Sequence, residues 1–144
     1  MKDNALHLDL LFPAVGASLQ TGTLDLGIDS PGASTAIGTE NLSDQWRLGR
    51  LRVSVPALPN NTNNAVNITI TLQDSGDYGA TFANTNPQIT VNIPGVAANG
   101  SAAQVVDVPL PPDTRGPIQF TVTVAANAGG DCTQAIGSID WVNE

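Results

Sequence analysis

The stretch VNITITL, residues 66–72, alternates apolar and polar side chains with a period of two. Successive side chains of a β-strand point to opposite faces, so this pattern is typical of a strand that packs one face on a core. The predicted inward residues are Val66, Ile68, Ile70 and Leu72. The segment DSGDYG that follows, residues 74–79, is rich in turn-forming residues and predicts the end of the strand.

The same alternation recurs along the chain, between segments rich in glycine, proline, asparagine and aspartate. We count eight such runs and expect one strand from each. Outside 66–72 the predicted inward residues are Leu6, Leu8, Leu10, Leu24, Leu26, Ile28, Leu51, Val53, Val55, Ile89, Val91, Ile93, Val106, Val108, Leu110, Ile118, Phe120, Val122, Val124, Ile139 and Trp141. Short strands at this spacing indicate an all-β fold, a single-domain antiparallel β-sandwich of the jelly-roll type with about eight strands. We expect it to occupy residues 1–144, with a short N-terminal arm.

The chain is acidic but carries few charges. It has 5 Lys plus Arg against 13 Asp plus Glu, so its net charge is −8, and 12% of its residues are charged. Nucleic-acid binding depends on basic residues that neutralise phosphates, so we expect no nucleic-acid partner. No segment approaches the roughly 20 apolar residues of a membrane-spanning helix, and we expect no membrane partner. The N-terminal apolar run is broken by Asn4, His7 and Asp9, unlike a secretion signal.

Residues that commonly carry catalysis are scarce. His7 is the only histidine, which argues against a nucleophile triad and against a histidine-based metal site. Of the two glutamates, Glu40 lies in an expected loop and Glu144 is the final residue, so a carboxylate pair for glycoside chemistry is not apparent. Cys132 is the only cysteine and excludes an intrachain disulfide. We therefore expect no catalytic residues, no metal, no cofactor and no enzyme activity.

Asp74 and Asp77 raise the question of a calcium site, because calcium takes carboxylate oxygens from loops. The stretch lacks the spacing of an EF-hand loop and its bidentate glutamate. The alternative is that these aspartates end the strand and cap the turn through their side chains. We favour this structural role.

Arg47, Arg50 and Arg52 form the one candidate basic patch of the chain. They would either grip the carboxylates of a partner in bidentate fashion or pair with aspartates of this chain. The predicted outward faces carry mostly Thr, Asn, Gln and Ser, which lose water at a lower cost than charged groups. Such faces suit contact with another protein, a crowded lattice or a glycan, although an ordinary surface in a lysine-poor protein would look the same.

Several motifs, taken in order, resemble the small capsid decoration (cement) proteins of tailed bacteriophages. They are MKDNALHLDL at residues 1–10, GTLDLG at 22–27, ITLQDSGDYGATFA at 70–83 and the closing segment 106–142, which begins VDVPLPPDTRGP. The resemblance covers most of the chain. It implies a jelly-roll domain without enzymatic activity that binds the outside of a phage head and clamps neighbouring major capsid subunits.

The resemblance further implies a homo-oligomer, a trimer or dimer, that is made in the host cytoplasm and ends on the capsid exterior of the virion. Its partner would be the major capsid protein. The candidate contacts are an N-terminal arm at Met1, Lys2, Asp3 and Asn4, and anchoring arginines at Arg47, Arg50 and Arg52.

Two functions of other classes stay open at this point. One is a receptor- or carbohydrate-binding jelly-roll module of a virion fibre or spike, which would normally display exposed aromatic residues for sugar stacking. The chain has 2 Trp, 1 Tyr and 3 Phe, mostly where strands need core residues. The other is a small sandwich hydrolase, which the single histidine and scarce glutamates disfavour.

Overall fold

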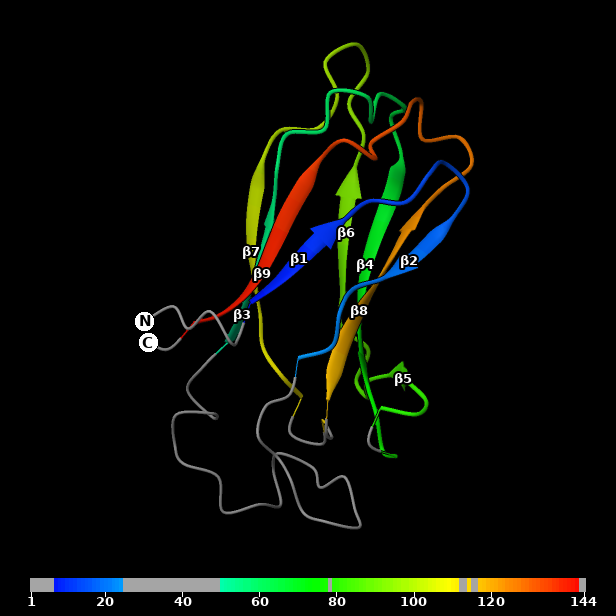
Figure 1. The fold of residues 1–144 in the computed structure, drawn as a ribbon. Helices are drawn as coiled ribbons and strands as arrows, with labels where there is room; N and C mark the ends of the chain where they lie inside the picture. The colour runs from blue at the N-terminus through cyan, green and yellow to red at the C-terminus, as the bar shows by residue number, and fades with distance from the viewer. Residues whose placement is uncertain (1–6, 25–49, 78, 112–113, 115–116, 143–144) are drawn as a thin grey trace.

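The structure is a computed structural model that describes residues 7–24, 50–77, 79–111, 114 and 117–142 (Figure 1). These residues form nine β-strands and no helix. The strands lie in two antiparallel sheets that face each other across a shared core. The prediction of an all-β, antiparallel sandwich is therefore confirmed.

The first sheet has four strands in the order β1-β9-β3-β7. Their bounds are β1 His7–Leu11, β9 Ile136–Val142, β3 Arg50–Val55 and β7 Gln104–Val108. The second sheet has five strands in the order β2-β8-β4-β5, with β6 also paired to β4. Their bounds are β2 Ser18–Gln20, β8 Ile118–Val124, β4 Val66–Asp74, β5 Ala83–Asn84 and β6 Thr90–Pro94. Strands next to each other in the chain mostly belong to different sheets, so the connecting loops cross between sheets at the ends of the sandwich.

The core is one cluster between the sheets, built from the inward side chains of both. It follows the predicted alternation closely in β8, where Ile118, Phe120, Val122 and Val124 are all buried. Ile139 and Trp141 of β9 are buried as predicted. Because each strand contributes every second residue, the opposite residues form two outer sheet faces, and these faces carry the surfaces described below.

The prediction for the start of β4 is wrong by one residue. Val66 is 55% exposed and Asn67 is 3% exposed, the reverse of the expected order. The register of β4 against β6 shifts between Val66 and Ile68, which moves Val66 out of the inward set. Asn67 is buried because its amide bonds to the neighbouring loop, and this loop contact was not visible in the alternation.

Two strands were not predicted at all. In β2 every residue is exposed, and β5 has only two residues, so neither shows an apolar alternation. Both are edge pieces that exist because the neighbouring strand offers backbone hydrogen bonds. Of the predicted run at Leu24, Leu26 and Ile28, only Leu24 is described; it is buried and forms an isolated bridge with Ile118. Leu6, Leu26 and Ile28 lie outside the described residues.

Candidate interaction surfaces

One end of the sandwich, at the top of Figure 1, is built from loops that connect the two sheets. We call this surface the loop end; it consists of residues 12–17, 56–65, 95–103 and 125–135. Asp131 is the only charged residue in these four segments, although the whole chain has 13 acidic residues. Val15 and Val96 of these loops are 39% and 46% exposed. The loop end is therefore an almost uncharged patch on an acidic protein.

Asparagine side chains tie the loops of this end to one another. The amide of Asn60 donates to the carbonyl oxygen of Asp131 at 2.7 Å, and the amide of Asn63 donates to that of Asn127 at 2.6 Å. On the other side, Asn64 Oδ1 accepts a bond of 2.8 Å from the backbone N–H of Ala97. The loop 56–65 is thereby bonded to both neighbouring loops.

A buried amide pair lies beneath these contacts. Asn67 Nδ2 donates to Asn61 Oδ1 at 2.8 Å and to the carbonyl oxygen of Asn63 at 2.7 Å. Asn61 Nδ2 lies 3.3 Å from Ser101 Oγ in the next loop. Buried hydrogen bonds of this kind fix one arrangement of the chain because breaking them leaves polar groups without partners. The loop end is consequently held in a defined shape before any partner arrives.

The outer face of the five-stranded sheet carries mostly uncharged polar side chains, with the exposed Val66 at the start of β4 as an apolar exception. We call it the polar face; it consists of Ser18, Gln20, Thr69, Thr71, Gln73, Asn84, Thr90, Asn92, Gln119, Thr121 and Thr123. Register pairing places them in rows across the strands, and side chains of the same row or of adjacent rows bond to each other. Ser18 Oγ lies 2.8 Å from Thr123 Oγ1, and Gln73 Oε1 accepts bonds from Gln119 at 2.9 Å and Thr121 at 2.8 Å. The prediction of Thr, Asn, Gln and Ser on an outer face is confirmed here.

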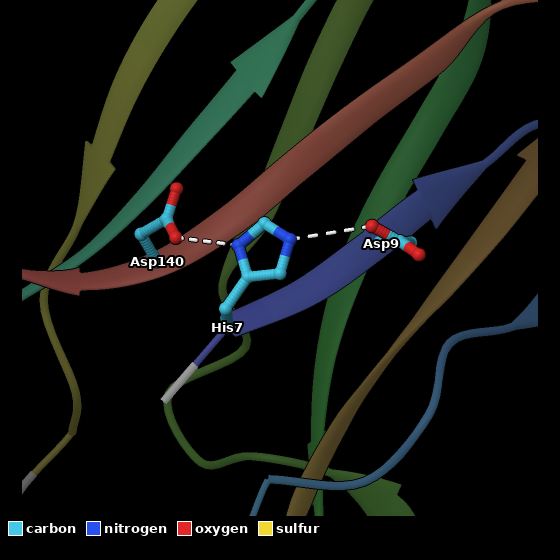
Figure 2. A network of polar contacts seen from close by, with 3 residues as sticks. All are labelled: His7, Asp9 and Asp140. Carbon is cyan, nitrogen blue, oxygen red and sulfur yellow. Dashed lines mark hydrogen bonds and ion pairs between the residues drawn. The ribbon is translucent and has the colours of Figure 1, made fainter. Parts of the chain in front are cut away.

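The outer face of the four-stranded sheet is different, because it holds charged groups. Figure 2 shows His7 between two carboxylates, with Nδ1 2.6 Å from Asp140 Oδ1 and Nε2 3.2 Å from Asp9 Oδ1. Asp140 is in register with His7 on one side and with Arg52 on the other. The histidine therefore links the edge strand β1 to β9 through side chains as well as through the backbone.

Arg52 pairs with Asp107 on the adjacent strand β7. Its Nε and Nη2 lie 2.8 Å and 3.2 Å from the two carboxylate oxygens, and Arg50 Nη1 lies 3.6 Å from Asp107 Oδ2. The hydrogen bond from Arg52, assisted by the positive charges of both arginines, holds the pKa of Asp107 below its ordinary value. Of the two alternatives for the arginines, pairing with this chain's own aspartates is found for Arg50 and Arg52. Contact with a partner stays a prediction, and Arg47 and residues 1–4 (Met1, Lys2, Asp3 and Asn4) lie outside the described residues.

Asp74 is the last residue of β4 and Asp77 lies in the turn after it, as predicted for residues that end the strand. Asp77 Oδ1 accepts bonds from Ser75 Oγ at 2.7 Å and from the backbone N–H of Thr81 at 2.8 Å. Its Oδ2 accepts a bond of 2.6 Å from Thr81 Oγ1. These bonds lower the pKa of Asp77 to about 2, and the side-chain bond from Thr81 makes the largest contribution. In the part of the chain that the structure describes, no three His, Cys, Asp or Glu side chains group together as metal ligands.

Because hydrogen bonds stabilise the ionised carboxylate of Asp77, we expect the protein to lose stability in acid. The pKa of Asp77 is 3.8 without these bonds and about 2 with them. The stabilisation is therefore complete above about pH 4 and is lost as the pH falls through about 2. We expect the melting temperature of the wild-type protein to fall more steeply over this interval than that of Asp77→Asn. Thermal unfolding followed by circular dichroism would measure both slopes; equal slopes would contradict the role of the carboxylate.

Cys132 lies in the loop end but not on its surface. The side chain is buried, and burial raises the pKa of the thiol, with a smaller contribution from Asp131. A raised pKa leaves little thiolate at neutral pH, and thiolate is the reactive form. The geometry thus favours a packing role for this cysteine.

No protein-family model matches this chain, and no curated protein sequence is similar to it. Among the described residues there is also no helix long and apolar enough to cross a membrane. The surfaces of the sandwich are therefore the basis of the function proposed below.

Proposed function

We propose that this chain is a non-enzymatic structural protein of a phage virion, a capsid decoration protein. It binds the outer surface of the head and stabilises contacts between major capsid subunits. The observation that carries this proposal is the loop end, an almost uncharged and internally bonded surface on a chain of net charge −8. The resemblance of the sequence to decoration proteins supplies the identity of the partner.

Two physical properties make the loop end suitable for such contact. Uncharged side chains lose water at a lower cost than charged ones, so a protein surface can cover them without leaving an unpaired charge. The asparagine bonds hold the loops in place, so little conformational entropy is lost on binding. The two exposed valines, Val15 and Val96, add apolar area to this uncharged surface.

The same proposal assigns the sandwich to the jelly-roll class. The sheet orders are β1-β9-β3-β7 and β2-β8-β4-β5 with β6 also on β4, so most paired strands are distant in the chain, and most neighbouring strands apart from β4, β5 and β6 lie in different sheets. Two interlocked sheets of this kind are what two Greek keys in succession produce. In such a fold the loops of one end form a single surface, and a protein can bind its partner through that surface.

The test is cosedimentation of the purified protein with expanded heads of the phage that encodes it, prepared without their decoration. We expect saturable binding at a fixed ratio to the major capsid protein. Val96→Glu should bind about tenfold more weakly or worse, because the contact would bury an unpaired carboxylate. Asn92→Glu places the same side chain on the polar face and should bind like the wild type. Absence of binding by the wild-type protein would overturn the proposal.

A second candidate function is favoured by the polar face. Rows of amide and hydroxyl groups can exchange hydrogen bonds with sugar hydroxyls, so this face would suit a receptor- or carbohydrate-binding module of a virion fibre or spike. A glycan array probed with wild-type protein and Asn92→Glu separates the two functions. Glycan binding that Asn92→Glu abolishes would favour this candidate over the decoration protein.

A further inference from the structure

A cleft lies between the edge strands β1 and β2, where the two sheets meet. Among the described strands β1 pairs with β9 and β2 pairs with β8, so no ladder joins these two edges. The cleft has a volume of about 280 Å³. This is just below the roughly 300–1,000 Å³ of small-molecule sites, so one long side chain or one small molecule fits. His7, Leu8, Asp9 and Leu11 line it on β1, and Gln20 and Thr21 line it at the end of β2.

The polar groups of the cleft are mainly hydrogen-bond acceptors. Asp9 Oδ1 lies 3.2 Å from His7 Nε2, and Figure 2 shows the second oxygen of this carboxylate turned away from the imidazole. None of the described residues bonds to that second oxygen or to the side-chain amide of Gln20. The hydroxyl proton of Thr21 is already donated to a backbone carbonyl oxygen at 2.8 Å. A ligand that brings several donors therefore matches the cleft.

Aliphatic side chains and a negative charge complete the site. Leu8 is 9% exposed and belongs to the core, whereas Leu11 is 46% exposed and offers apolar surface to a ligand. None of the described residues that line the cleft is a lysine or an arginine. Asp9 carries its charge on a chain of net charge −8, and such a chain attracts cations and repels anions.

We propose that this cleft binds an alkylammonium group, which is an aliphatic chain that ends in a protonated amine, as in a lysine side chain. An ammonium group has three donors and no acceptor, so it bonds to Asp9 Oδ2 and to Gln20 Oε1. The methylene chain packs against Leu11, as the stem of a lysine does on apolar surface. An anionic ligand would be repelled by Asp9, and a neutral one would leave its carboxylate without a counter-charge. The alkylammonium group matches both the charge and the acceptors of the cleft.

An NMR titration of the purified, nitrogen-15-labelled protein tests the proposal. The probes are Nα-acetyl-lysine methylamide and Nα-acetyl-norleucine methylamide, which has the same carbon chain without the amine. We expect the lysine compound to shift the signals of the Gln20 side-chain amide and of Gly22, which also lines the cleft. Its dissociation constant should be on the order of 1–10 mM, as for a ligand of this size. The norleucine compound should bind at least threefold more weakly. Equal binding of the two compounds, or no shift at these residues, would overturn the proposal.

Asp9→Asn removes the charge of the cleft and keeps the shape of the side chain. We expect this variant to bind the lysine compound at least threefold more weakly than the wild type, and no more tightly than the norleucine compound. Asp131→Asn is the matched control, because it removes one exposed carboxylate from the loop end and leaves the cleft unchanged. It should bind like the wild type. Equal losses in the two variants would mean that the net charge attracts the probe and that the cleft does not bind it.

A third probe, 1,5-diaminopentane, separates the two sources of this chemistry, a lysine side chain of a partner protein and a free amine. If the lysine compound binds as tightly as the diamine or more tightly, the cleft is a site for a side chain of a partner. If the diamine binds at least threefold more tightly, and Asp9→Asn removes this preference, the cleft is a site for a free amine. A diamine that binds Asp9→Asn as tightly as the wild type would overturn the proposal. None of these titrations contains phage heads, so their outcome is independent of capsid binding.

Discussion

The Phe120→Ala variant is expected to lose about 3–5 kcal/mol of unfolding free energy, the largest single effect that we foresee. Phe120 is completely buried and is among the largest fully buried side chains of the core. It lies on the central strand β8, in register with Leu72 of β4. Truncation removes the apolar contact area and leaves a cavity that neighbours bonded into two sheets cannot close. Urea denaturation at neutral pH would measure the loss.

Thr123→Ala is the matched control for this variant, because Thr123 lies on the same strand but on the outer face. Its side chain is exposed and makes one bond, to Ser18 Oγ. We expect it to change stability by roughly 0.5 kcal/mol or less. Similar losses in the two variants would mean that the core does not lie between the sheets at β8.

The second large effect is expected for Gly95→Ala, at the start of the loop after β6. A Cβ atom there would lie 2.1 Å from the carbonyl oxygen of Asn63 and 2.4 Å from Asn67 Nδ2. Asn63 belongs to the bonded loop 56–65 and Asn67 to the start of β4, and neither can move without breaking the buried amide contacts. We expect a loss of about 2–3 kcal/mol or more, together with weaker capsid binding, because the same contacts shape the loop end.

Gly22→Ala is the control, since a Cβ atom at Gly22 would meet only Leu8 Cδ2, at an ordinary 3.6 Å. This variant should match the wild type in urea denaturation and in binding. If Gly95→Ala were as stable as Gly22→Ala, the loop end would have more freedom than its hydrogen bonds indicate. In that case the preorganisation that supports the proposed function would be lost.

The candidate surfaces were predicted from the sequence only in part. The uncharged character of an outer face follows from the residues that alternate with Ile68 and Val122, and it could be predicted. The loop end could not, because its four segments are far apart in the chain and only the strand order brings them together. A signal was present nonetheless: the segments 56–65, 95–103 and 125–135 all contain asparagine, and their single charge is at Asp131.

The arginine patch illustrates the same limit. Arg50 and Arg52 alternate with Leu51 and Val53, so their outward direction could be predicted. Their partner could not, because Asp107 lies 55 residues further along the chain from Arg52. Nothing near His7 in the sequence indicates that Asp140, on the last strand, bonds to it.

Local sequence patterns predict the all-β sandwich, most of the strand residues that face the core, and the turn at Asp77 that ends β4. These properties depend on local alternation and on turn chemistry, so each is contained in a few neighbouring residues. The strand pairing was needed to find the edge strands β2 and β5, the exposure of Val66, the loop end and the cross-strand contacts of the four-stranded sheet. Each of these depends on contacts between residues distant in the chain, and their register is set by strand pairing rather than by the pattern within one strand.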